Sequence, residues 1–238
     1  MRIDKLLAHC GYGTRKEVKN LLKEKIVFVN DQLVISDKIH VDPQKDKIRV
    51  GDDEIFYEEY VYYMLNKPQG YVSATVDNVY PTVIELIDDE VHDDLFPVGR
   101  LDVDTEGLLL ITNDGKLAHR LLSPKHHVDK TYFTRVEGRV DQEDQKAFEK
   151  GCVLDDMTCL PAHLEIVRVD DNLSTCLVTI AEGKFHQVKR MFLSVGKKVV
   201  FLKRITMGPI VLDENLELGA YRRLRQDEID RLYAVDML

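Results

Sequence analysis

The stretch "GRLDVDTEGLLLITNDG", Gly99–Gly115, decides the fold of the larger part of this chain. Three carboxylates, those of Asp102, Asp104 and Glu106, stand directly before the apolar run Leu108–Ile111. A short apolar run that ends in an Asn-Asp-Gly turn signal is typical of a buried strand. The carboxylates therefore form either a solvated loop or a reactive group held at the end of a rigid element.

Segments on both sides of this strand extend the pattern. We predict further strands in "YVYYMLNKP", "KTYFTRVEG", "STCLVTIAEG" and "KKVVFLKRITMG", and helices over residues 116–122, 142–150, 186–195 and 227–233. Because strands dominate and helices are interspersed between them, we expect an α+β domain over residues 59–238. Its sheet is expected to be mixed and mainly antiparallel.

The first part of the chain predicts a smaller unit. Thr14, followed three residues later by Glu17, is the capping-box signature of a helix start, and the apolar residues after it share one helical face. The run "IVFVNDQLV" predicts a hairpin around Asn30-Asp31. The acidic stretch at residues 52–59 interrupts this pattern, so we place the domain boundary after residue 58.

The charge of the chain is unevenly distributed. The formal net charge is −9, which by itself argues weakly against a nucleic-acid partner. Residues 1–25, however, contain seven lysines and arginines against three acids, and residues 183–204 contain seven against none. A polyanion responds to the local potential of one face, so these segments favour RNA as a partner. The alternative is that both are ordinary solvated surfaces.

Several classes of protein are disfavoured by composition. No apolar run approaches the ~20 residues of a membrane-spanning helix, and the N-terminus lacks the apolar stretch of a signal peptide. We therefore expect a cytoplasmic protein with no membrane partner. The four cysteines include no C-x-x-C pair and the histidines show no metal-binding spacing, so we expect plain thiols and no metal.

Asp102 is the first candidate for chemistry. Arg100 lies two residues before it, and on an extended chain both side chains point the same way. A neighbouring cation keeps a carboxylate ionised and therefore available as a nucleophile. The same tripeptide is also compatible with a loop that has no catalytic role.

The second candidate is "EGKFHQVKRMF", at residues 182–192, where a helix is predicted to begin. Its Lys184, His186, Lys189 and Arg190 suit phosphate binding, and a lysine or arginine there can instead pair with a buried carboxylate. A solvated basic helix is the alternative.

Two further motifs carry weaker signals. Tyr132, on a predicted strand, has a ring that can stack on a base and a hydroxyl that can move a proton, although most strand tyrosines are core residues. The segment "NKPQGY", residues 66–71, is interpreted as a structured turn after a buried strand and not as a catalytic element.

Taken together, these motifs resemble one family. The segments "MLNKPQGYV", "GRLDVDTEGLLLITNDG", "SPKHHVDKTY" and "EGKFHQVKRMF" occur in the order found in the RsuA-like bacterial ribosomal-RNA pseudouridine synthases. The N-terminal "RIDKLLAHCGYGTRKEVKNLLKEKIVFVND" is similar to the S4-like RNA-binding domain that precedes their catalytic domain. The resemblance covers nearly the whole chain, and the residues of the motifs are closer to those of the small-subunit member than to those of the large-subunit relatives.

The resemblance implies a function and a set of site residues. It implies that Asp102 is the nucleophile that converts a uridine to pseudouridine, with Tyr132 and Lys189 as its catalytic partners. It implies that Arg100 helps to open the RNA and to fill the space left by the flipped base. Together with the basic segments it gives the expected RNA-binding residues: Arg100, Arg2, Lys5, Arg15, Lys16, Lys19, Lys184, His186 and Arg190.

The implied substrate is structured ribosomal RNA or a small-subunit assembly particle, most directly 16S rRNA at the position usually numbered 516. Since uridine and pseudouridine are isomers, no redox or energy cofactor is expected, and we expect a monomer. Two other classes compete with this hypothesis. One is a non-catalytic RNA-binding or assembly factor. The other is a glycoside hydrolase that uses Asp102 and Asp104, although neighbours on one strand would not face each other across a sugar.

Overall fold

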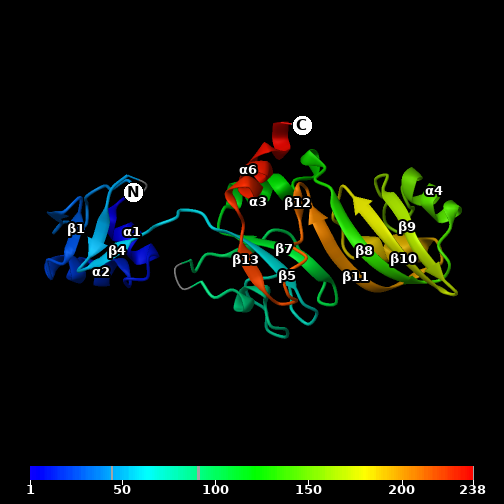
Figure 1. The fold of residues 1–238 in the computed structure, drawn as a ribbon, viewed down its shortest axis with the longest axis horizontal. Helices are drawn as coiled ribbons and strands as arrows, with labels where there is room; N and C mark the ends of the chain where they lie inside the picture. Colours follow the sequence, from blue (N-terminus) through cyan, green and yellow to red (C-terminus); the bar gives the residue numbers. More distant parts are fainter. Residues whose placement is uncertain (44, 90–91, 238) are drawn as a thin grey trace. The chain divides into compact units, whose positions relative to one another are not determined.

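The computed structural model describes residues 1–43, 45–89 and 92–237. By their contacts, Met1–Val61 and Asp88–Asp94 form one compact unit, and Tyr62–Ile87 and Leu95–Leu238 form a second. Each unit contains its own sheet (Figure 1). The boundary after residue 58 stays a prediction about which part of the chain folds and binds RNA by itself.

The N-terminal unit packs two short helices on a small antiparallel sheet. The helices are α1 (Ile3–His9) and α2 (Arg15–Lys23), and the strands, in the order β2-β1-β3-β4, are β1 (Val27–Val29), β2 (Gln32–Leu33), β3 (Ile48–Val50) and β4 (Asp53–Ile55). The predicted capping box starts α2, since the Glu17 carboxylate accepts a hydrogen bond of 2.7 Å from the Thr14 backbone N–H. Asn30 and Asp31 adopt left-handed conformations and close the predicted hairpin between β1 and β2.

The larger unit is built on a nine-stranded sheet. Its helices and 3₁₀ turns are η1 (Val83–Leu86), α3 (Gly115–Leu122), η2 (Pro124–His126), α4 (Gln142–Lys150), α5 (Gln187–Ser194), α6 (Gln226–Tyr233) and η3 (Ala234–Met237). Its strands are β5 (Tyr62–Lys67), β6 (Phe96–Pro97), β7 (Glu106–Thr112), β8 (Lys130–Glu137), β9 (His163–Asp170), β10 (Leu173–Ile180), β11 (Lys198–Met207), β12 (Ile210–Val211) and β13 (Tyr221–Arg223). The main order is β13-β5-β7-β11-β8-β10-β9, with β6 on β7 and β12 on β11. The predicted fold class, α+β with a mixed and mainly antiparallel sheet, is confirmed.

One junction in the sheet is parallel. Among the described strands, β7 and β11 are the pair that runs in the same direction, and this pair joins the two halves of the sheet. Gly107 lies at the junction with a φ of +102°, and a Cβ built on it would come within 2.2 Å of the Arg204 carbonyl oxygen. The strands therefore approach each other at a point that only glycine permits.

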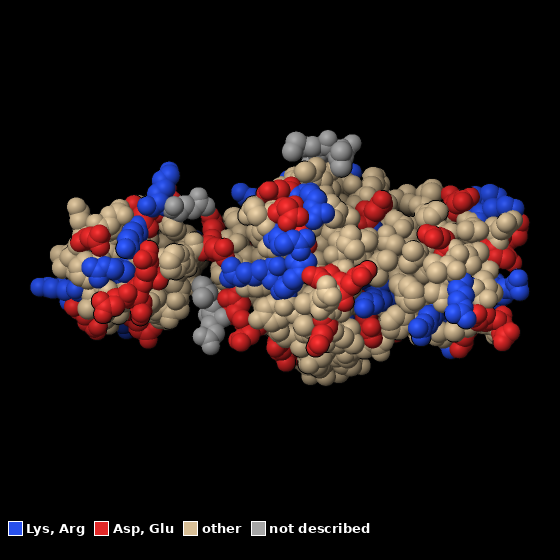
Figure 2. All heavy atoms as spheres, viewed as in Figure 1, with Lys and Arg blue, Asp and Glu red and all other residues tan. Residues whose placement is uncertain are grey.

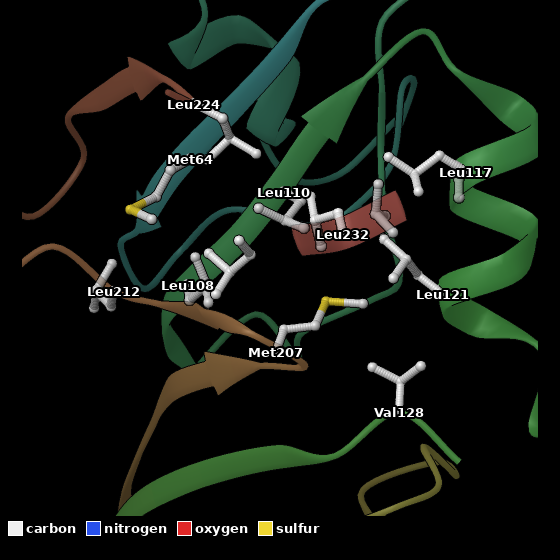
Figure 3. Close-up of a cluster of buried hydrophobic side chains, with 13 residues drawn as sticks. Met64, Leu108, Leu110, Leu117, Leu121, Val128, Met207, Leu212, Leu224 and Leu232 are labelled. Carbon is white, nitrogen blue, oxygen red and sulfur yellow. The ribbon is translucent and has the colours of Figure 1, made fainter. Parts of the chain in front are cut away.

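The hydrophobic core of this half lies between the sheet and two helices. Met64, Leu108 and Leu110 project from β5 and β7, and Figure 3 shows them facing Leu117 of α3 and Leu232 of α6. Burying side chains of this size contributes about 1.5–3 kcal/mol each. The strand β7, which carries this apolar run, is thus bonded to a neighbouring strand at each edge and packed against the core on one face.

Five strands were not predicted from the sequence, and three of them, β6, β12 and β13, are only two or three residues long. β4 lies inside the acidic stretch and is largely exposed. β9 was assigned to no element, although Leu164 and Ile166 alternate with polar residues in its first half. Both are edge strands, where charged residues discourage pairing with other chains. None of the helices formed by the described residues combines the length and the apolar character that a membrane crossing requires.

Candidate active site

The parallel junction explains why two distant segments meet. α5 packs against β11 and is joined to it by residues 195–197, so the helix runs back along the strand. Eight helical residues span about 12 Å, the length of about four strand residues. The first turn of α5 therefore lies near Lys203, whose partner on β7 is Glu106. The carboxylates that precede β7 and the basic residues that begin α5 are brought to the same place.

Lys189 is the centre of this contact. Its Nζ donates hydrogen bonds to Asp102 Oδ2 at 2.8 Å and to Asp104 Oδ1 at 2.6 Å. The Asp102 and Lys189 side chains are 24% and 21% exposed, whereas Asp104 is 64% exposed. Burial alone would lower the pKa of Lys189, but the bonds to the two carboxylates outweigh it and raise that pKa. The same lysine outweighs the effect of burial on Asp104 and lowers the pKa of its carboxyl group.

His186 approaches the other oxygen of the same carboxylate. Its Nε2 lies 3.6 Å from Asp102 Oδ1. The backbone of His186 is left-handed, with a φ of +48° at the N-cap of α5. Asp102 thus has Lys189 at one oxygen and an imidazole at the other, so a carboxylate that is reached from solvent is fixed in orientation.

Lys67 holds the backbone of the carboxylate loop. Its side chain is fully buried, and its Nζ donates to the carbonyl oxygens of Pro68 at 3.0 Å, Asp102 at 3.0 Å and Thr105 at 2.9 Å. Burial is the largest influence on this group and lowers the pKa of Lys67 to about 8, although the neighbouring carboxylates oppose the change. The turn at residues 66–71, which was predicted to be only structural, therefore also positions the candidate nucleophile.

One row of residues crosses the sheet beneath this loop. Lys67 on β5 pairs with Gly107 on β7, Gly107 with Arg204 on β11, and Arg204 with Tyr132 on β8. Directly opposite residues share a face. Tyr132 is two strand spacings, roughly 10 Å, from Gly107. Its side chain is 7% exposed and lies on the buried face of β8, so it is on the same side of the sheet as the lysine that holds the loop.

The expected pairing of Arg100 with Asp102 is not found. Thr105 donates its backbone N–H to the Asp102 carbonyl, so Val103 and Asp104 form a turn and the chain is not extended there. Arg100 is exposed, and among the described residues it makes no ion pair with Asp102. The cation at Asp102 is instead Lys189, which the family resemblance implied as its partner. The turn also places Asp102 and Asp104 on one ammonium group, not across a substrate.

The other predicted RNA-binding residues fall into two groups. Lys5, Arg15, Lys16 and Lys184 are exposed. Arg2 and Lys19 both pair with Asp37, and Arg190 pairs with Asp156. On the visible face of the N-terminal unit, basic side chains are interspersed with acidic ones (Figure 2). The RNA-binding assignment of these residues stays a prediction.

Comparison with known proteins identifies the family of the chain. Residues 61–194, more than half of the chain, match the model of the RNA pseudouridylate synthase family. The chain belongs to the RNA pseudouridine synthases. These enzymes are isomerases, and the predictions of the family and of an enzyme are both confirmed. The matched segment contains Lys67, Asp102, Tyr132 and Lys189.

Alignments with related proteins extend over nearly the whole chain. It is 46% identical over 98% of both chains to the uncharacterized RNA pseudouridine synthase YtzG of Bacillus subtilis (strain 168). It is 42% identical to the ribosomal small subunit pseudouridine synthase A of Haemophilus influenzae, over 98% of this chain and 99% of that protein. A crystal structure of a pseudouridylate synthase superposes with a TM-score of 0.68 at 41% identity, covering 98% of this chain and 99% of the other. The resemblance to the RsuA-like enzymes is thereby confirmed.

Proposed function

We propose that this synthase converts a uridine of small-subunit ribosomal RNA to pseudouridine, at the position of 16S rRNA usually numbered 516, with Asp102 as the nucleophile. The single observation that carries the assignment of the nucleophile is the geometry at Asp102. It is a partly exposed carboxylate whose backbone is tied to Lys67 and whose side chain is tied to Lys189. The small-subunit substrate is supported by full-length relatives that carry this activity in their names.

The reaction exchanges one bond to the ribose for another. A carboxylate oxygen of Asp102 adds to C1′, and the N1–C1′ bond breaks with its electron pair remaining on the uracil. The uracil then rotates, and its C5 attacks C1′ and displaces the carboxylate. The proton on C5 is lost and N1 gains one, so the product is an isomer of the substrate and no atoms remain on the enzyme.

Lys189 and Tyr132 are proposed to support these steps. Lys189 holds the Asp102 carboxylate in one orientation by its hydrogen bond, which favours nucleophilic attack. Tyr132 is assigned to the uracil, where its ring stacks on the base and its hydroxyl assists proton transfer. The target nucleotide must be flipped from the RNA at a cost of a few kcal/mol. Contacts from the basic residues to phosphates offset that cost.

The test is tritium release from small-subunit RNA transcribed with uridine labelled at C5, given as free RNA and as partly assembled particles. Wild type should release tritium, and Asp102→Asn should release none while binding the RNA with nearly unchanged affinity. Asp104→Asn is the matched control, since it removes a carboxylate that binds the same lysine but is mostly exposed. Appreciable turnover by Asp102→Asn would refute the nucleophile. Release from large-subunit RNA alone would refute the substrate.

A further inference from the structure

A rigid turn precedes α5. The Gln187 side chain is buried, and its amide oxygen accepts a hydrogen bond of 2.9 Å from the Lys184 backbone N–H. Its amide nitrogen donates to the Glu182 carboxylate at 2.7 Å, and the same carboxylate accepts a bond of 2.8 Å from the backbone N–H of Leu160. The two residues between Lys184 and Gln187 are thus carried on a turn that is tied to the body of the unit.

Those two residues are Phe185 and His186, and their rings are stacked. The centroids are 3.8 Å apart and the planes are inclined by 18°. Phe185 is 76% exposed, although a phenylalanine normally gains free energy by burial. His186 is held in a left-handed conformation that is unfavourable for a residue with a Cβ. Strain of this kind concentrates at ligand contacts.

The stacked pair lies beside the candidate nucleophile. His186 Nε2 is 3.6 Å from Asp102 Oδ1, and Phe185 stacks on that same imidazole. The aromatic pair is therefore within reach of the nucleotide next to one that is flipped toward Asp102. Lys184, exposed at the start of the turn, provides a cation for the phosphate between them.

We propose that Phe185 and His186 form a stacking platform for the base adjacent to the target uridine. The proposal rests on the proposed function. When a nucleotide is flipped out, its neighbour loses a stacking partner, and an exposed aromatic face replaces that partner. Stacking needs only a planar face, so the platform accepts any of the four bases and contributes affinity without selecting the sequence.

The experiment compares Phe185→Ala, Phe185→Leu and Phe185→Tyr on the labelled small-subunit RNA. Alanine and leucine should each weaken RNA binding and lower kcat/KM by about tenfold, and tyrosine should restore both. The melting temperature should not change, because the side chain is exposed. Leu193→Ala is the matched control, since it removes a 60% exposed apolar side chain at the opposite end of α5.

Each outcome decides the proposal. Loss with alanine and leucine but not with tyrosine supports a planar stacking surface. Wild-type behaviour of all three variants overturns it, as does full activity of Phe185→Leu, which would indicate an apolar contact without stacking. A wild type that binds the RNA but releases no tritium refutes the proposed function alone. The RNA affinities of the same variants then decide the platform.

Discussion

Replacement of Lys67 by methionine tests how the proposed nucleophile, Asp102, is positioned. Methionine keeps an unbranched apolar side chain but removes the ammonium group that binds the carbonyls of Pro68, Asp102 and Thr105. The side chain is fully buried, so no water takes the place of the lost donor. The loop that carries Asp102 would keep its sequence and its bond to Lys189 but lose its backbone tether.

Two opposing contributions set the effect on stability. Each hydrogen bond from the ammonium contributes about 1.5–3 kcal/mol. Against this, the burial that lowers the pKa of Lys67 from 10.5 to about 8 costs about 3 kcal/mol, and the variant is relieved of that cost. The three bonds together contribute about 4.5–9 kcal/mol. We therefore expect a net loss of about 1.5–6 kcal/mol and a decrease in Tm of at least about 3 °C.

The same substitution should also lower the rate of catalysis. A displacement of about 1 Å at a reacting group lowers the rate by about 100-fold. Single-turnover tritium release should therefore show kcat reduced by about that factor, with RNA affinity within twofold of wild type because Lys67 does not reach the surface. Lys116→Met, at an exposed lysine of α3, is the control. A folded Lys67→Met enzyme with kcat within threefold of wild type would refute the reasoning.

The pH dependence of the wild type gives an independent check. Lys67 is charged below about pH 8 in the folded protein and below about 10.5 in the unfolded chain. Above pH 8 the tether weakens, so kcat should fall between pH 7 and 9. Between pH 8 and 10.5 the unfolded state binds more protons, so this group makes the folded state more stable as pH rises. The loss of activity is thus not due to unfolding, and a flat profile over that range would contradict the role of Lys67.

Three other perturbations have defined outcomes. Gly107→Ala should destabilise the fold by about 3 kcal/mol in urea titrations, because the new Cβ meets backbone on the next strand. The control Gly183→Ala has open space around its new Cβ and should be near neutral. Equal losses of stability in the two variants would contradict the close approach of the strands. Lys189→Met should lower kcat about 100-fold and Lys189→Arg should retain most activity, so equal rates for the two would show that the cation is not needed. Deletion of residues 1–58 should weaken binding to structured RNA and lower kcat/KM while tritium release persists. An unchanged kcat/KM would show that this segment does not help the enzyme to bind its RNA.

Much of the fold could be predicted from the sequence, because local signals agreed with the tertiary structure. The bounds predicted for α4 coincide with those found, and the apolar run after Glu106 is a buried strand as predicted. The edge strand β4 lacks an apolar face and gave no such signal, whereas the alternation of Leu164 and Ile166 in β9 was a signal that was missed. Element type was therefore predictable where a hydrophobic face had to be buried.

The candidate site was harder to predict from the sequence than the fold. Asp102 and Lys189 are 87 residues apart, and no spacing rule joins them, so only the family resemblance placed them together. Lys67 was overlooked because its role depends on three carbonyls that converge in space. The one available signal was a lysine at the end of a largely buried strand, where a buried ammonium needs acceptors.

The parallel junction between β7 and β11 also bears on how the enzyme is made. Because it pairs segments that are far apart in the chain, its closure carries a large loop entropy and belongs among the later events of folding. Asp102 and Lys189 belong to opposite sides of that junction. A partly folded or still-growing chain therefore lacks the contact between Asp102 and Lys189. Under the proposed function, it becomes reactive toward RNA only after the two halves of the sheet have joined.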